Sequence, residues 1–349
     1  LKLSGFLPVE VKYAGQTHAL KLYVVDNGNA TLLGRDWLQA IKLDWKSIKF
    51  LQPNANNCAV EDIERLKKRY SDLFDNKLGR MVNFKATLHL QDNVKPVFMK
   101  ARQIPYAMRD KVENELNRLE QDGVISKVNS SEWATPIVPI VKKNNQIRIC
   151  GDYKITVNPL IKTDRYPLPK PQDIFATLAG GEKYSKLDLK QAYLQCEVDD
   201  ATLELLTLNT HKGLYKVNRL AFGISSSPAI WQRKMEQILN GISYCHVILD
   251  DILVTGRNDA EHLNILQQVF QRLLSHGLRL NVQKCSFLQN RLEYCGHVLT
   301  KHGVQQSHEK ISAIVNAPAP KNISQLRSVL GLINYYHNHL PNVSSVLNP

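Results

Sequence analysis

The sequence predicts an α+β fold, and three observations predict it. Residues 1 to about 50 alternate polar and apolar side chains in short runs, as in residues 20–25, which favours strands. Residues 61–74 and 261–274 carry apolar side chains at helical spacing instead. Residues 245–254 form an apolar run rich in Val and Ile, which is typical of buried strands.

Length and charge bound the organisation of the chain. Its 349 residues leave room for roughly two domains with a sizeable core. The 45 Lys and Arg against 32 Asp and Glu give a formal net charge of +13, which suits a polyanionic partner such as nucleic acid. Charge alone leaves open a basic protein without such a partner.

The six cysteines are scattered along the chain. None forms a C-x-x-C pair, which argues against a zinc knuckle and for free thiols in a reducing compartment. No signal peptide and no apolar run long enough to span a bilayer is present, so no membrane partner is expected. Because the sequence begins with Leu1, we expect a piece of a longer protein.

Two adjacent carboxylates, Asp250 and Asp251, lie in the middle of the apolar run. Charges inside such a run are costly unless something pairs with them, so we expect a tight β-hairpin with both aspartates at its tip. There they are either solvated or hold a divalent cation, because Mg²⁺ takes oxygen ligands and relieves the repulsion between carboxylates. An ordinary Asp-Asp turn is the alternative.

A second short strand is expected in residues 184–193, which carry Asp188 and, five residues further on, Tyr193. Three aspartates on two adjacent strands form the ligand set for two-metal nucleotidyl transfer, in which one ion activates a 3′-hydroxyl and the other stabilises leaving pyrophosphate. With this combination the chain resembles the reverse transcriptases of Ty3/gypsy-type retrotransposon polyproteins. The resemblance implies that Asp188, Asp250 and Asp251 are catalytic and hold two Mg²⁺ ions, with Mn²⁺ as an alternative.

The resemblance follows the chain in order from about residue 74 to residue 349 and implies a right-hand polymerase. Fingers and palm are expected in residues 75–258, and the thumb with the start of the connection in residues 259–349. A linker and helix, residues 51–74, precede them.

The N-terminal residues 1–50 resemble a different family. They close with Leu-Leu-Gly-Arg-Asp-Trp-Leu at residues 32–38, which resembles the C-terminal signature of retropepsin-like aspartic proteases, where the Gly-Arg-Asp step opens a short helix. The catalytic Asp-Thr/Ser-Gly triplet of that family has no room upstream, and residues 26–28, Asp-Asn-Gly, are better interpreted as a turn. We therefore expect the tail of a protease without an active site of its own.

A basic hairpin is expected where residues 133–143 and 146–150 flank the turn Asn144-Asn145. It resembles the fingers hairpin of reverse transcriptases, which implies that Lys142, Lys143 and Arg148 face the incoming triphosphate. Arg suits bidentate contact with phosphate, and Lys acts as a point charge. An ordinary solvated hairpin is the alternative.

Residues 220–232 lead from a Gly-containing loop into a helix that continues to about Leu239, with Pro228 in its first turn. The family uses this loop to line the nucleotide, which implies places for Phe222 and Gly223 near the base and sugar. Tyr193 is implied to be the aromatic gate that packs under the sugar and rejects a 2′-hydroxyl. A core aromatic is the alternative for Tyr193.

The last third of the chain carries further matches. Residues 284–287 match the family's Lys-Cys-x-Phe motif, in which Lys284 either donates a proton to leaving pyrophosphate or lies on the surface. Residues 292–298 resemble the primer-grip hairpin, which assigns Tyr294 and Gly296 to the primer–template. Helices are expected in residues 311–315 and 323–336.

Two positions depart from the family pattern. Ile248 stands where the family has a tyrosine next to the primer–template, and a basic residue usual before the Thr-His-Lys-Gly hairpin is replaced around Leu203. Each departure marks either a decaying copy or a tolerated variant.

We therefore expect an RNA-directed DNA polymerase that takes an RNA or DNA template with a primer and deoxynucleoside triphosphates (dNTPs). The alternative is a non-catalytic, nucleic-acid-binding remnant of the element, whereas the missing triplet excludes an active aspartic protease. The RNase H and integrase regions of the parent polyprotein are expected to be missing. The expected location is cytoplasmic, with a virus-like particle or the nucleus as alternatives.

Overall fold

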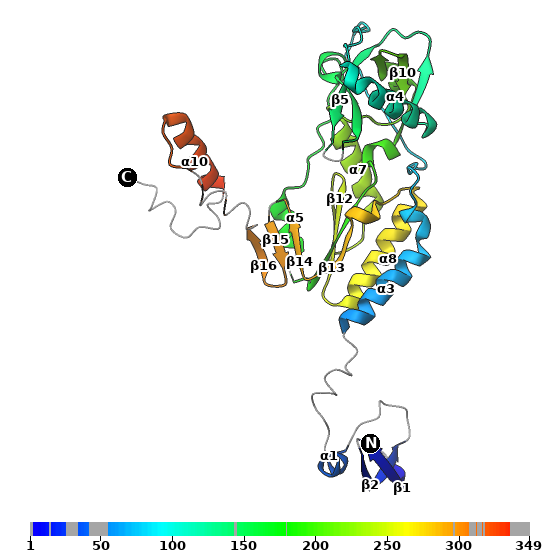
Figure 1. The fold of residues 1–349 in the computed structure, drawn as a ribbon, viewed down its shortest axis with the longest axis vertical. Coiled ribbons are helices and arrows are strands. Elements are labelled where there is room, and N and C mark those ends of the chain that lie inside the picture. The colour runs from blue at the N-terminus through cyan, green and yellow to red at the C-terminus, as the bar shows by residue number, and fades with distance from the viewer. Residues whose placement is uncertain are drawn as a thin grey trace. The chain divides into compact units, whose positions relative to one another are not determined.

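The computed structural model describes residues 3–13, 15–25, 34–41, 55–142, 145–178, 180–295, 297–306, 312, 316 and 318–335 (Figure 1). The chain divides into two compact units, Leu1–Glu61 and Asp62–Pro349. The turn expected at residues 26–28 and the helix expected at residues 311–315 lie outside the described residues, apart from residue 312. None of the described helices is long and apolar enough to cross a bilayer.

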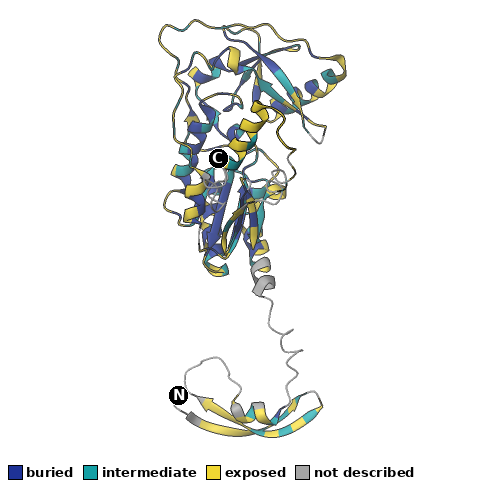
Figure 2. Cartoon of the chain, turned by 90° about the vertical axis from the view of Figure 1, so that its left-hand side faces the viewer, coloured by how far each residue is buried: buried dark blue, intermediate teal, exposed yellow. Residues whose placement is uncertain are grey.

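The first unit contains an antiparallel ribbon of β1 (Leu3–Tyr13) and β2 (Gln16–Val25). Most of its described side chains are exposed or half-buried (Figure 2). The short helix α1 (Arg35–Ala40) begins at the Gly-Arg-Asp step, as the sequence predicts. The indole N–H of Trp37 donates to the carbonyl of Lys21 on β2 at 2.8 Å, which fixes this helix to the ribbon.

The second unit is built on a four-stranded sheet with the strand order β11-β12-β7-β13. Its strands are, in chain order, β7 (Lys183–Asp188), β11 (Cys245–Ile248), β12 (Asp251–Gly256) and β13 (Ser286–Gln289). The helices α7 (Ser227–Leu239) and α8 (Asp259–Ser275) pack against it.

The central strand β12 is covered on both faces. Ile252 and Val254 belong to the main core, whereas Leu253 between them packs with Tyr184 in a second buried cluster. Successive residues of a strand point to opposite faces, so a strand buried on both sides is apolar throughout. This arrangement explains why residues 252–254 are apolar without alternation.

The helix expected at residues 61–74 is shorter at its C-terminal end. The helix α3 (Ala55–Arg69) stops where Tyr70 leaves the helical region, and the 3₁₀ turn η1 (Ser71–Phe74) follows. The rings of Tyr70 and Phe74 then both meet Phe270 of α8 edge-on, with centroids 5.9 and 5.4 Å away.

A five-stranded sheet with the order β4-β10-β9-β5-β6 forms the other half of this unit. Its strands are β4 (Ile125–Val128), β5 (Thr135–Val141), β6 (Ile147–Gly151), β9 (Thr207–Thr210) and β10 (Gly213–Val217). The helix α4 (Tyr106–Gln121) packs on β6 and β4 and ends before Gly123, whose φ of +66° suits a helix terminus.

Shorter elements complete the unit. They are β3 (Lys85–Ala86), η2 (Tyr153–Ile155), α5 (Pro171–Thr177), η3 (Ala192–Gln195), β8 (Glu197–Val198), α6 (Asp200–Leu205), η4 (Val282–Lys284), β14 (Arg291–Tyr294), β15 (His297–Thr300), β16 (Gly303–Gln306) and α10 (Ile323–Tyr335). Figure 1 shows β14, β15 and β16 as one small sheet.

Candidate active site

The turn between β11 and β12 contains two residues, Leu249 and Asp250. The register pairs Ile248 with Asp251, so Asp251 opens β12 and only Asp250 lies in the turn. The prediction that both aspartates lie at the tip is therefore wrong for Asp251. Leu249 has a φ of +51°. Two-residue hairpin turns require such a left-handed conformation, and it is unfavourable for a residue with a side chain.

Helix α7 holds this turn through two side chains. The fully buried Gln232 donates from Nε2 to the carbonyl of Val247 at 2.8 Å, and its Oε1 accepts the N–H of Leu249 at 2.7 Å. The indole N–H of Trp231 donates to the carbonyl of Leu249 at 2.9 Å. These bonds satisfy the backbone of the turn and hold its left-handed residue in place. Sequence reasoning gave neither side chain a role, although a glutamine inside an apolar helix face was a usable signal.

Asp188 ends β7 and lies directly opposite Asp251 on β12. Residues opposite each other in an antiparallel pair share a face of the sheet. Lys186, two residues earlier on the same face, forms an ion pair with Asp251 at 2.9 Å. The ammonium of Lys284 lies 3.5 Å from Oδ2 of Asp188.

The electrostatic setting of Asp188 and Asp250 is unfavourable for two negative charges. Burial raises the pKa of both carboxyls, and the charge of Asp251 raises both further. Asp188 adds to the increase at Asp250, while Lys284 opposes the increase at both. Oδ1 of Asp250 is buried without a hydrogen-bond partner among the described residues.

These features fit a divalent cation, because oxygen ligands that repel each other and an unsatisfied carboxylate oxygen are what a cation relieves. The pair Asp188 and Asp250 offers such oxygens, and Asp251 is engaged by Lys186. Within the part of the chain that the structure describes, no three His, Cys, Asp or Glu side chains are arranged closely enough to be a metal site as they stand.

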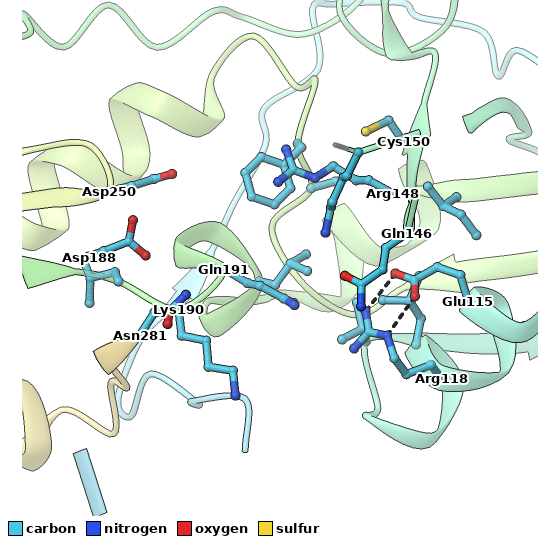
Figure 3. A pocket seen from close by; sticks show the side chains of 18 of the residues that line it. Glu115, Arg118, Gln146, Arg148, Cys150, Asp188, Lys190, Gln191, Asp250 and Asn281 are labelled. Atoms are coloured by element: carbon cyan, nitrogen blue, oxygen red, sulfur yellow. Dashed lines mark hydrogen bonds and ion pairs between the residues drawn. The ribbon is translucent and has the colours of Figure 1, made fainter. Parts of the chain in front are cut away.

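A cavity of about 870 Å³ separates these carboxylates from the β5–β6 hairpin. Figure 3 shows Asp188 and Asp250 on one wall and Arg148, with Gln146, on the other. The floor between them includes Gln191, which follows Asp188 on the chain. The strand ends and the hairpin tip, far apart in sequence, therefore face the same space.

The predicted nucleotide-binding residues divide into groups. Lys142, Arg148, Phe222 and Lys284 line this cavity. The guanidinium of Arg148 lies 5.2 Å from the ring centre of Phe222, and burial together with Arg148 lowers the pKa of Lys142. An anion bound between the two cations would relieve their mutual repulsion. Lys143 lies outside the described residues.

Tyr193 and Gly223 do not line the cavity. Tyr193 is 8% exposed and packs on Phe222 and Trp231, with ring centroids 5.0 and 5.9 Å away. Burial raises the pKa of its phenol to about 12, so the hydroxyl stays protonated at neutral pH. Gly223 has a φ of +93°, and a Cβ there would lie 3.4 Å from the carbonyl of Gly151.

The predicted primer–template residues lie near the second buried cluster. Ile248 on β11 is half-buried and packs against this cluster, and Tyr294 on β14 belongs to it. The ammonium of Lys186 lies 5.3 Å from the ring centre of Tyr294. Gly296 lies outside the described residues.

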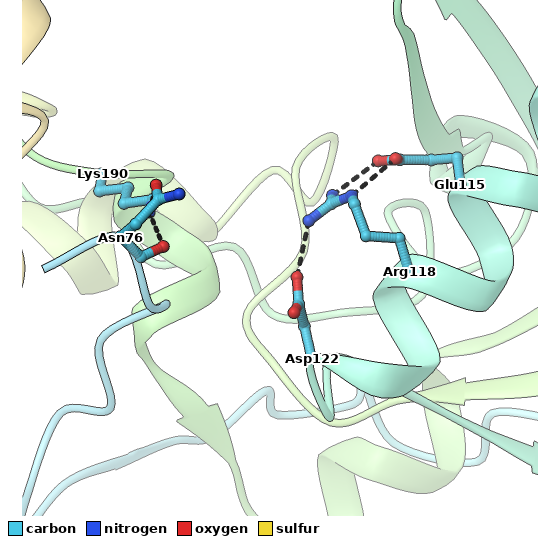
Figure 4. Close-up of polar contacts among 5 residues, drawn as sticks. All are labelled: Asn76, Glu115, Arg118, Asp122 and Lys190. Carbon is cyan, nitrogen blue, oxygen red and sulfur yellow. Dashed lines mark hydrogen bonds and ion pairs between the residues drawn. The ribbon is translucent and has the colours of Figure 1, made fainter.

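Two polar clusters at the edge of the cavity were not predicted. Arg118 on α4 binds Glu115 at 2.8 Å and Asp122 at 2.6 Å. Lys190, two residues after Asp188, binds the side-chain oxygen of Asn76 at 2.8 Å and its backbone carbonyl (Figure 4). The second contact ties the turn after Asp188 to the segment that follows η1.

Part of the chain matches a known protein family. Residues 140–299 match the family described as reverse transcriptase (RNA-dependent DNA polymerase). These residues are therefore similar to a reverse transcriptase domain. They contain Asp188, Asp250 and Asp251, the Arg148 side of the cavity, and the Lys-Cys-x-Phe motif.

The chain is similar to retrotransposon polyproteins over most of its length. It is 34% identical over 340 residues to an uncharacterized protein of Caenorhabditis elegans, covering 96% of this chain and 27% of that protein. It is 30% identical over 316 residues to the Retrovirus-related Pol polyprotein from transposon 297 of Drosophila melanogaster, covering 87% and 30%. The polyprotein from transposon gypsy of the same organism is 27% identical over 338 residues, with 91% and 32% covered. The chain spans about a third of these relatives or less.

Solved structures confirm the predicted fold class. The foamy viral protease-reverse transcriptase dRH in complex with double-stranded DNA has a TM-score of 0.75 at 22% identity, covering 98% of this chain and 62% of that one. The same viral protein with an RNA/DNA hybrid has a TM-score of 0.72 at 22% identity, covering 98% and 48%. The chain therefore has the α+β polymerase fold of a reverse transcriptase.

Proposed function

We propose that this chain is an RNA-directed DNA polymerase, which adds dNTPs to the 3′-hydroxyl of a primer on an RNA or DNA template. The observation that carries the proposal is the placement of Asp188 and Asp250 on one wall of a cavity whose opposite wall presents Arg148. Phosphoryl transfer needs carboxylates that hold metal ions and, opposite them, basic side chains that bind the triphosphate.

The chain's own residues would divide the work. Arg148 and Lys142 would bind the triphosphate, Arg by paired hydrogen bonds and Lys as a point charge. Asp188 and Asp250, with Asp251 as a third ligand, would hold two Mg²⁺ ions, or Mn²⁺ in their place. When bound, such ions activate the attacking hydroxyl and stabilise the leaving pyrophosphate. Lys284 lies 3.5 Å from Asp188, where it could donate a proton to pyrophosphate.

Two further residues would shape the nucleotide site. Phe222 lines the cavity, and the ring of Tyr193 packs against it with a centroid separation of 5.0 Å. Together the two rings would restrict the space beside the sugar. Gly223 would let the backbone approach the nucleotide closely, because it has no side chain and its φ of +93° is one that other residues rarely adopt.

The surroundings of this domain are part of the proposal. Because the chain spans about a third of the length of the Pol polyproteins that it matches, we place RNase H and integrase activities elsewhere in a parent polyprotein. The ribbon and helix α1 of residues 1–50 would be the tail of a protease. A cytoplasmic location fits such an element, with a virus-like particle or the nucleus as alternatives.

A second candidate is a remnant that binds nucleic acid without turnover. The observation that favours it is Ile248, which stands beside the carboxylate pair where the family has a tyrosine. Isoleucine is compatible with a strand, and the hairpin is intact around it.

Primer extension separates the two candidates. The purified chain is incubated with a primed RNA template, the four dNTPs and Mg²⁺, and the product lengths are read on a gel. Extension that depends on the template sequence and on the added metal supports the polymerase. Binding of the primed template without any extension, with Mg²⁺ and also with Mn²⁺, supports the remnant.

A further inference from the structure

The turn η4 and its two flanking residues make three contacts with one residue, Asp188. The N–H of Asn281 donates to the carbonyl of Asp188 at 2.9 Å. The N–H of Asp188 donates to the sulfur of Cys285 at 3.4 Å. The ammonium of Lys284 lies 3.5 Å from the Asp188 carboxylate. Backbone carbonyl, backbone amide and side chain are thus all held by residues 281–285.

The sulfur contact follows from how β13 pairs with β7. Ser286, the first residue of β13, lies opposite Lys186, and the register shifts before the next pair. Asp188 lies two residues beyond Lys186, where β13 no longer runs beside β7. The N–H of Asp188 therefore donates to the side chain of Cys285 and not to a backbone carbonyl of β13.

The start of this segment is held firmly. Gln195, which is fully buried, accepts the N–H of Arg279 at 2.7 Å and donates from Nε2 to the carbonyls of Arg279 and Lys190 at 3.0 and 2.8 Å. The N–H of Lys190 also donates to the carbonyl of Arg279 at 3.0 Å. Since residues 279–281 are fixed beside residues 188–190, the chain has little freedom to replace the sulfur contact by moving.

We propose that Cys285 is a positioning residue for Asp188: its sulfur accepts the Asp188 amide and, together with Asn281, sets where the carboxylate points relative to Asp250. This role rests on the proposed function for its effect on activity, but not for the contact itself. In this proposal the cysteine of the Lys-Cys-x-Phe motif holds the backbone of Asp188, whereas its neighbour Lys284 lies near the carboxylate.

The test compares three single variants of the whole chain. Cys285→Ala removes the acceptor, and Cys285→Ser replaces it with a hydroxyl, a stronger acceptor. Cys196→Ala is the control, because Cys196 lies in the main core, against which the half-buried Cys285 packs, and its sulfur bonds to the backbone of Glu197 and Ala86 and not to that of Asp188. Equal thermal stability of the two alanine variants would show that they disturb the core alike.

The first readout does not need activity. Hydrogen exchange of peptides that cover β7 is followed by mass spectrometry, and we expect the Asp188 amide of Cys285→Ala to exchange roughly tenfold faster, the effect of losing one hydrogen bond. Cys285→Ser should restore protection, and Cys196→Ala should leave this amide as in the wild type. Unchanged exchange in Cys285→Ala would overturn the proposal.

The second readout is the Mg²⁺ dependence of single-turnover dNTP addition. A misplaced Asp188 weakens the metal site, so Cys285→Ala should raise the half-saturating Mg²⁺ concentration about threefold to tenfold. Cys285→Ser should bring it back, and Cys196→Ala should not change it. An unchanged Mg²⁺ dependence in an active Cys285→Ala protein would reduce the thiol to a structural role and overturn the proposal. If the wild type adds no nucleotide, the proposed function fails, and hydrogen exchange alone decides whether Cys285 holds Asp188.

Discussion

Tyr193 lies behind the cavity wall, packed between Phe222 and Trp231. Removing its ring would leave space next to Phe222, which lines the cavity, so a 2′-hydroxyl could be accommodated there. We expect Tyr193→Ala to lower the preference for dNTP over rNTP by at least about tenfold, the order of discrimination that one shaped pocket provides. Single-nucleotide incorporation of both substrates measures the ratio.

Tyr193→Phe is the matched control, since it keeps the ring and removes only the hydroxyl. It should preserve the sugar preference of the wild type. If Tyr193→Ala and Tyr193→Phe show the same preference for dNTP over rNTP, then Tyr193 is a core aromatic and does not select against the 2′-hydroxyl.

His262 is a fully buried histidine on α8 whose two ring nitrogens are both engaged. Nδ1 lies 3.1 Å from the carbonyl of Lys183 and therefore carries the hydrogen, so Nε2 accepts the hydroxyl of Ser185 at 2.8 Å. Burial lowers the pKa of His262 from 6.5 to about 4. The folded state thus keeps this ring neutral at a pH at which the unfolded chain protonates it.

The buried His262 makes the free energy of unfolding fall as the pH is lowered. Below pH 6.5 the unfolded chain binds a proton at His262 that the folded chain refuses, so this contribution to the free energy of unfolding is complete above pH 6.5 and is lost as the pH falls to about 4. The loss is on the order of 3 kcal/mol. The raised pKa values of Asp188 and Asp250 act in the opposite direction, so only a comparison between variants isolates the histidine.

His262→Gln offers a donor and an acceptor but does not titrate. Urea unfolding at pH 7 and pH 5 gives the free energy of unfolding at each pH. The contribution that the wild type loses on going from pH 7 to pH 5 through His262 should be absent in His262→Gln, so lowering the pH should destabilise the variant less. His302→Gln, at an exposed histidine, is the control and should behave as the wild type. Parallel pH dependence in wild type and His262→Gln would contradict this account of the buried ring.

At the scale of elements, the β11–β12 hairpin depends on helix α7. Gln232 satisfies two backbone groups of the turn, so Gln232→Leu leaves the N–H of Leu249 and the carbonyl of Val247 without these partners. We expect a loss of about 2 kcal/mol in the free energy of unfolding, the cost of leaving buried polar groups unpaired. The rate of nucleotide addition should fall by more than the loss of folded protein accounts for, because the turn contains Asp250.

The measurement pairs urea unfolding with single-turnover addition at saturating primer–template. Gln268→Leu, an exposed glutamine on α8, is the control and should stay within about 0.5 kcal/mol of the wild type. A Gln232→Leu protein with wild-type rate and stability would show that the turn holds itself.

The elements also show how far the sequence predicts the structure. Helical periodicity predicted α8, the apolar run predicted the β11–β12 hairpin, and Pro228 in the first turn supported α7, because these signals are local in the sequence. The two-residue turn was not predicted: the pattern could not tell a tip of two aspartates from one of Leu249 and Asp250, since this depends on strand register. Nor could it predict that Tyr70 ends α3, because the contact with Phe270 is made between distant segments.

The candidate site divides in the same way. Asp188, Asp250, Lys142 and Arg148 were expected at the site from their motifs, and the fold brings all four to one cavity. The residues that hold them were missed, as with Gln232 and Gln195. Each is a polar side chain on an apolar background, and its partners are backbone groups that carry no sequence signal.

At the scale of the whole molecule, the excess of positive charge is the feature most relevant to a nucleic acid partner. The formal net charge is +13, and cationic side chains line the cavity. We expect primer–template affinity to fall steeply with salt, with a log–log slope of about −0.9 for each phosphate neutralised on duplex DNA. Fluorescence anisotropy between about 50 and 200 mM salt gives this slope. A slope near zero would mean that the charge is not used to bind nucleic acid.

The central claim is that the carboxylates on one wall of the cavity carry out metal-dependent nucleotide addition. Its most direct test is single-turnover addition of one dNTP to a primed RNA template in Mg²⁺ by the wild type and by Asp250→Asn. Losing this charge should lower the rate by about 100-fold or more, while primer–template affinity stays within about threefold. A wild type that binds the primed template but adds nothing, or an Asp250→Asn protein that keeps the wild-type rate, would contradict the claim.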